Sequence, residues 1–145
     1  MNNTMKNALG IILGVIVGGV VNGGLIAIGP MLVPPPAGVD MTTVEGMAAG
    51  MDQLGPINFA VPFLAHALGT LVGALVAYLA APNKTLAVYF IGAFYLLGGI
   101  AASIMIPAPL WFILLDLIVA YLPMAWLALK VGEILKLSSS PEVKP

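Results

Sequence analysis

Four long apolar stretches, separated by short breaks that contain proline or polar residues, dominate the pattern of hydrophobic and polar positions along the chain. Each stretch is close to the roughly 20 residues that an α-helix needs to cross the ~30 Å hydrocarbon core of a bilayer. Proline lacks an amide hydrogen and disfavours helix in the residue before it, so the proline-containing breaks mark helix ends. The pattern therefore predicts an all-α, polytopic bundle with four transmembrane helices at about 8–32, 57–81, 85–106 and 110–129.

Two of the three breaks are tight turns, Pro82-Asn83-Lys84 and Pro107-Ala108-Pro109. Turns this short make the second, third and fourth helices antiparallel neighbours. The predicted membrane domain covers residues 1–137, and the polar residues 138–145 are predicted to form a disordered cytoplasmic tail.

The longest connection, from Val33 to Pro56, contains its own helix signal. Thr42-Thr43-Val44-Glu45 matches a capping box, in which the first hydroxyl and the last carboxylate cap a helix start. The match predicts a short amphipathic helix at about 43–54, lying at the membrane surface. Gly46 and Gly50 weaken this helix, because glycine is costly inside a helix.

Composition supports a membrane protein and excludes several other classes. The chain is 61% hydrophobic and 8% charged, whereas soluble domains average about 25% charged residues. The bilayer is therefore the expected surrounding. A net charge of −1, with no arginine, argues against nucleic acid as a partner. The absence of cysteine excludes disulfides, thiolate metal sites and thiol nucleophiles.

The charges are divided between the two predicted membrane faces. All the lysines fall on the face that carries the termini and the 82–84 turn, and the opposite face carries Asp40, Glu45 and Asp52. Positive loops stay cytoplasmic, so we expect both termini inside, in a multi-pass plasma membrane protein. The lysines are Lys6, Lys84, Lys130, Lys136 and Lys144.

Glycines recur at helical spacing in the first three spans. Lipid tails are as apolar as leucine, so helices associate in a bilayer where small residues let the backbones approach. We interpret these glycines as helix-packing positions, and the sequence leaves open whether they join helices of one chain or of several. Self-association, or incorporation into a larger membrane complex, is expected. The positions are Gly10, Gly14, Gly18, Gly69, Gly73, Gly98 and Gly99.

A few polar side chains lie well inside the predicted spans: Asn22, His66, Tyr95 and Asp116. At 1.5 Å per residue they lie at similar depths, about 9–16 Å from the outer helix ends. Each also lies on a small-residue face of its helix. Because a charged group is costly in lipid, such residues turn inward and find partners. We therefore expect these residues to form a cluster in which His66 and Asp116 face one another.

Two interpretations of the His66–Asp116 pair stay open. In the first, it is a titrating pair for proton coupling or a polar ligand site, since histidine changes charge near neutral pH. In the second, it is a satisfied hydrogen-bonded pair that fixes how the helices align. The outer acids Asp40, Glu45 and Asp52 have two interpretations as well, because Glu45 and Asp52 can guard a cation entrance or be solvated surface charges.

The remaining features indicate anchoring rather than chemistry. Trp111, Trp126, Tyr78 and Tyr121 lie near span ends and are interpreted as interface anchors. A single histidine cannot make a zinc site, so no metal and no cofactor is expected.

The stretch from Pro62 to Ala74 (PFLAHALGTLVGA), the Asn22-Gly23-Gly24 element, and Pro109-Leu110-Trp111-Phe112 followed by Asp116 resemble a group of small four-helix bacterial membrane proteins known only as hypothetical proteins. The resemblance covers nearly the whole chain. It implies a bacterial inner membrane and brings no known activity.

The leading hypothesis is a non-catalytic membrane protein, a structural or accessory helix-bundle subunit. The alternative is a small oligomeric proton-coupled transporter or channel that uses His66 and Asp116. An enzyme is not expected, because no catalytic motif is present.

Overall fold

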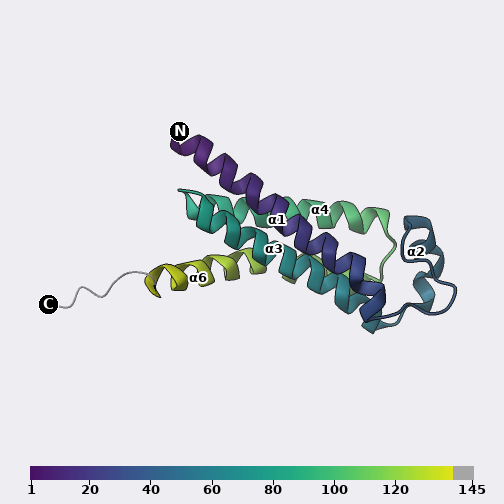
Figure 1. Ribbon diagram of the computed structural model, residues 1–145. Helices are drawn as coiled ribbons and strands as arrows, with labels where there is room; N and C mark the ends of the chain where they lie inside the picture. Colours follow the sequence, from purple (N-terminus) through teal and green to yellow (C-terminus); the bar gives the residue numbers. More distant parts are fainter. Residues whose placement is uncertain (139–145) are drawn as a thin grey trace.

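The computed structural model describes residues 1–138, which are helical apart from turns and connections and contain no strand (Figure 1). Ser138, assigned to the tail by the sequence pattern, is the last residue of the final helix, and residues 139–145 lie outside the described residues. The elements are α1 (Asn3–Leu32), α2 (Val44–Gly50), η1 (Met51–Gln53), η2 (Pro56–Phe59), α3 (Ala60–Ala80), α4 (Lys84–Met105), α5 (Leu110–Val119) and α6 (Leu122–Ser138).

Four helical stretches are long and apolar enough to cross a membrane, as the sequence pattern predicts. They are Asn3–Leu32, Pro56–Ala80, Lys84–Met105 and Leu110–Lys136. Large apolar side chains remain on the outside of the bundle. On α1, for example, Ile16 is 57% exposed and Val20 is 70% exposed. An apolar surface of this kind is costly in water and is favourable in lipid.

The fourth stretch is not one straight helix, because α5 ends at Val119 and α6 begins at Leu122. Pro123 explains the break: it has no amide hydrogen to donate to the Val119 carbonyl, and its ring collides with that carbonyl in a continuous helix. The Ala120 amide still donates to the Asp116 carbonyl at 2.9 Å. The break turns the chain at Ala120 and Tyr121.

Helix α3 lies at the centre of the bundle and contacts α1, α4, α5 and α6. Its seam with α1 is made of glycines. A Cβ on Gly18 would lie 2.6 Å from the Gly69 carbonyl oxygen, and a Cβ on Gly73 would lie 2.7 Å from the Gly14 carbonyl oxygen. Only glycine allows backbones this close. These packing glycines therefore join helices of the same chain.

The other predicted packing glycines fall into two kinds. Gly10 meets the backbone of Ala81, and Gly99 lies under the ring of Tyr121. Gly98 has no atom within 4 Å of the place where its Cβ would be, so within the described residues it packs against nothing.

The two ends of the bundle differ. At one end, the Asn83 amide donates to the Asn7 side-chain oxygen at 2.8 Å, which ties the α3–α4 turn to the start of α1. Figure 1 shows α6 running to this same end, and α2 lying at the opposite end. We call these the lysine end and the α2 end. Asp40, Glu45 and Asp52 are exposed at the α2 end.

The short helix in the first connection begins one residue later than the predicted capping box requires. Thr43, not Thr42, is the N-cap, and its hydroxyl oxygen accepts from the Gly46 amide at 3.0 Å. The capping box from Thr42 to Glu45 is therefore wrong. Gly46 and Gly50 have a packing role, since a Cβ on either would lie 2.5 Å from an atom of the preceding 39–40 segment.

Candidate functional site

His66 of α3 and Asp116 of α5 form the contact that the sequence pattern predicts. The Nδ1 atom of His66 lies 2.9 Å from each carboxylate oxygen of Asp116. Asp116 is 5% exposed, so its carboxylate is held almost entirely inside the protein. A buried carboxylate needs a partner at this distance, because an unpaired charge there is strongly unfavourable.

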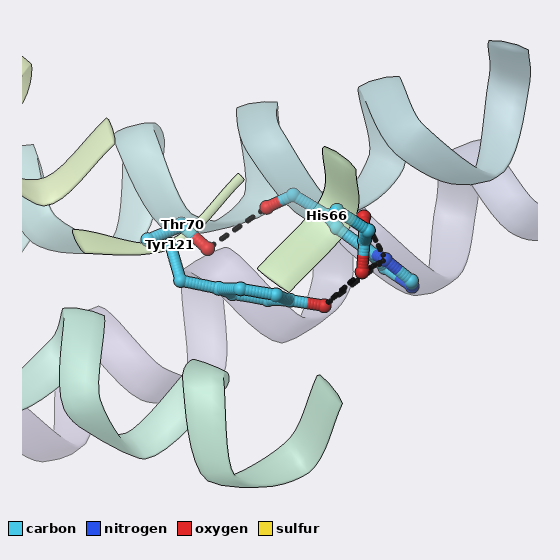
Figure 2. Close-up of polar contacts among 4 residues, drawn as sticks. His66, Thr70 and Tyr121 are labelled. Carbon is cyan, nitrogen blue, oxygen red and sulfur yellow. Dashed lines mark hydrogen bonds and ion pairs between the residues drawn. The ribbon is translucent and has the colours of Figure 1, made fainter. Parts of the chain in front are cut away.

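Tyr121 contacts both members of this pair (Figure 2). We call His66, Asp116 and Tyr121 the triad. Its hydroxyl donates to Oδ2 of Asp116 at 2.7 Å and lies 3.1 Å from Nδ1 of His66. Its ring stacks on the imidazole with centroids 5.9 Å apart and planes 28° apart. Tyr121 is 2% exposed, so the interpretation of this residue as an interface anchor is wrong. Tyr78 is also buried, with its ring over Gly132.

The hydrogen bonds assign a proton to His66. An ionised carboxylate only accepts hydrogen bonds, so Nδ1 of His66 carries the hydrogen that it shares with Asp116. The other ring nitrogen, Nε2, has no hydrogen-bonding partner within residues 1–138 and is not enclosed by them. Four residues further along α3, the Thr70 hydroxyl donates to the His66 carbonyl at 2.8 Å. The imidazole is therefore fixed through Nδ1 and presents Nε2.

Asn22 and Tyr95, predicted to join this cluster, make no hydrogen bond to His66 or Asp116. The Tyr95 hydroxyl donates to the Val15 carbonyl of α1 at 2.7 Å, beside Gly18 and Gly19, which have no side chains to block it. The Asn22 Cβ packs against Gly69, and its amide makes no hydrogen bond within the described residues. Of the four residues predicted to form the cluster, only His66 and Asp116 contact each other through hydrogen bonds. Tyr121, which was not predicted to belong to it, joins them.

An apolar cavity of about 420 Å³ lies at the α2 end and has His66 and Asp116 in its wall. Its other walls come from α1, η2, α4 and α5, and the connection between α1 and α3 covers it with Met41, Met47 and Met51. Ligand pockets in proteins typically measure about 300–1,000 Å³ and are mostly apolar, with a few placed polar groups. The cavity and the triad together fit that description. No motif in the sequence signals this cavity, because it depends on how the helices diverge.

The aromatic wall of the cavity is built around Phe59 and Phe112. Their rings lie 4.8 Å apart at 41°, and Trp111 meets the edge of Phe59 with ring centroids 5.5 Å apart. Phe59 and Phe112 line the cavity, and Trp111 stands immediately behind Phe59. Trp111 therefore lies one ring away from the cavity.

The outer acids take no part in the cavity wall. Asp40 accepts hydrogen bonds from the Thr42 hydroxyl at 2.6 Å and the Thr42 amide at 2.8 Å, and these bonds hold the pKa of Asp40 below its ordinary value. Glu45 and Asp52 are exposed and do not line the cavity. Nowhere in residues 1–138 do three or more histidine or acidic side chains gather closely enough to hold a metal ion.

No family model, curated protein or solved structure matches this chain.

Proposed function

We propose that this chain is a membrane-embedded binding protein that holds a small molecule in the cavity at the α2 end and anchors it through Nε2 of His66. The observation that carries the proposal is the orientation of one imidazole. Its Nδ1 is fixed by Asp116 and Tyr121, and its Nε2 has no partner in the described chain although His66 lines a cavity of about 420 Å³. A ring nitrogen held in this way is a pre-oriented contact for a ligand.

The purely structural interpretation explains less. A hydrogen-bonded pair that only aligns helices needs no cavity beside it, and natural interiors are otherwise close-packed. The cavity is lined by apolar groups on several elements, which favours a bound molecule over a packing defect. Binding is compatible with the role of an accessory subunit in a larger membrane complex.

The transporter or channel alternative has less support. Between the triad and the lysine end, the helices close on one another through small buried side chains, among them Ala74, Ala77, Ala125 and Ala128, each 0% exposed. A continuous path through one chain would have to open this packed half. The geometry therefore favours access from one side, which suits binding better than conduction.

We further propose that the four long helices cross a bacterial inner membrane with both termini in the cytoplasm and α2 at the outer surface. The apolar helices, the lysines near the termini and the exposed acids at the α2 end support this orientation. In this arrangement the cavity lies in the outer half of the membrane.

The test of binding is the release of a small molecule from purified protein, followed by mass spectrometry. Wild type should yield one molecule that is depleted in Ala102→Phe, a change that adds a large side chain to the cavity wall on α4 and leaves the three triad residues unsubstituted. Ala101→Phe is the matched control, because Ala101 is exposed on the same helix and does not line the cavity. Equal amounts in all three proteins would refute a ligand held in this cavity.

A further inference from the structure

We infer that the ligand of this cavity is a lipid-soluble quinone or its quinol, with the ring inside the cavity and one ring oxygen on Nε2 of His66. This inference rests on the proposed binding function and specifies its ligand. It is argued from four properties of the site: the charge of its lining, the hydrogen-bonding capacity of His66, the side chains that would contact a ring, and the position of the cavity beside the lipid-facing surface.

The lining selects an uncharged molecule. No lysine among residues 1–138 lines the cavity, so a phosphate or carboxylate head would have no cationic partner there. Asp116, the one acidic group that the described part of the chain contributes to the wall, already accepts hydrogen bonds from His66 and Tyr121. An amine head would therefore have to share this carboxylate with two donors that already hold it. A charged ligand is costly to transfer into such a site.

His66 can bind a ligand oxygen that is a carbonyl in one form of the ligand and a hydroxyl in the other. With Nδ1–H donated to Asp116, the neutral imidazole offers a lone pair at Nε2 and accepts a hydrogen bond from a hydroxyl. The protonated imidazole carries a hydrogen at Nε2 and donates it to a carbonyl. The protonated imidazole can therefore bind the quinone, and the neutral imidazole can bind the quinol in the same position.

The remaining lining suits a flat ring. Phe59 and Phe112 present aromatic surfaces, and the covering connection adds the thioethers of Met41, Met47 and Met51. Aromatic rings pack favourably on other rings and on methionine sulfur. Methionine is also flexible, so the cover can adjust to substituents on the ring.

The cavity lies beside the surface that faces lipid. Ile26 of α1 lines the cavity and is 42% exposed, and Ser103 of α4 lines it and is half-buried. A molecule dissolved in the bilayer can therefore reach the cavity between α1 and α4, with its prenyl tail remaining in lipid. Polar metabolites, which arrive from water, have no such advantage.

The two tryptophans provide the test. Trp126→Phe leaves Trp111, which lies behind the cavity ring Phe59, and Trp111→Phe leaves Trp126 on α6. In lipid vesicles, a decyl-substituted benzoquinone should quench Trp111 fluorescence along a saturating curve. Trp126 should be quenched only in proportion to the quinone dissolved in the bilayer. The reduced, quinol form should compete for the same site.

Adding His66→Ala to the Trp126→Phe protein should weaken binding about tenfold, the equivalent of one lost hydrogen bond. Adding Ala102→Phe should abolish saturation although His66, Asp116 and Tyr121 are all unsubstituted, which covers the case in which the His66 variant does not fold. Identical unsaturated quenching of both tryptophans would overturn the quinone assignment. If a different molecule is released from wild type but not from Ala102→Phe, the binding function stands and the quinone assignment fails. If nothing is released and nothing saturates, both fail.

Discussion

The hydroxyl of Tyr121 donates to Oδ2 of Asp116 at 2.7 Å, although the two residues lie five apart across the break in the fourth membrane stretch. On a continuous helix, residues three and four apart share a face, and residues five apart do not. The break before Pro123 turns Tyr121 back toward the carboxylate. The break is therefore part of the site, because it brings Tyr121 to the buried Asp116 as a second hydrogen-bonding partner beside His66.

We predict that Tyr121→Phe destabilises the protein by about 1.5–3 kcal/mol, the usual contribution of a hydrogen bond to a charged group. The ring that packs on Gly99 is kept, so packing is not the cause of the loss. Thermal unfolding in detergent, followed by circular dichroism, measures the effect.

Tyr78→Phe is the matched control for this change. The Tyr78 side chain is also buried, and its hydroxyl, which is not itself enclosed, makes no hydrogen bond within residues 1–138. Removing that hydroxyl should change stability by much less. Equal effects of the two substitutions would show that the Tyr121–Asp116 hydrogen bond adds nothing specific.

We predict that His66 reacts with diethyl pyrocarbonate in the folded protein, because Nε2 is accessible from the cavity. His66 is the one histidine of the chain, so the ultraviolet absorbance of the product reports this site alone. Ala102→Phe should slow the reaction several-fold by filling the cavity, whereas Ala101→Phe should leave the rate unchanged. A His66 that reacts only after unfolding would contradict an open cavity.

The fold was predictable because its signals are local. Apolar runs and proline breaks indicate where helices begin and end, and the span ends at the three breaks agree with the prediction to within one residue. The two outer ends differ more, because the first span begins at Asn3 rather than at 8 and the fourth ends at Lys136 rather than at 129. The His66–Asp116 contact was predictable for a different reason: a bundle with so few buried polar groups leaves each of them few possible partners.

The rest of the site depends on geometry that no local pattern specifies. The Tyr95 hydroxyl reaches the Val15 carbonyl, and not the His66–Asp116 pair, because two glycines expose that part of α1. Depth can be estimated from residue counts, whereas helix rotation cannot be estimated as closely. Tyr121 and the cavity were missed because both depend on the direction of the kink and on how the α1–α3 connection folds over the helices.

We predict that Gly18→Leu separates α1 from α3. A side chain there would collide with the Gly69 carbonyl oxygen, at 2.6 Å from its first carbon, and with the Tyr95 hydroxyl, at 2.7 Å. Overpacking of this kind typically costs about 1–3 kcal/mol, and more where backbone must move. Gly23→Leu is the control on the same helix, since Gly23 has nothing within 4 Å. Similar unfolding temperatures for the two variants would contradict the glycine seam.

The cover of the cavity should be stable to mild acid and should loosen only in strong acid. Asp40 accepts hydrogen bonds from Thr42 and Thr43, and the Thr43 hydroxyl in turn caps α2. These bonds lower the pKa of Asp40 below its ordinary value of 3.8, so the stabilisation is complete above 3.8 and is lost as the pH falls through the lower, folded-state pKa. The protection factor of the Gly46 amide, which compares its exchange rate with the intrinsic rate at the same pH, should therefore stay constant at neutral and mildly acidic pH and fall below that pKa. In Asp40→Asn the Gly46 amide should be less protected from exchange at neutral pH, and its protection should no longer depend on this titration. If the variant and the wild type show the same dependence of protection on pH, Asp40 does not hold the start of α2.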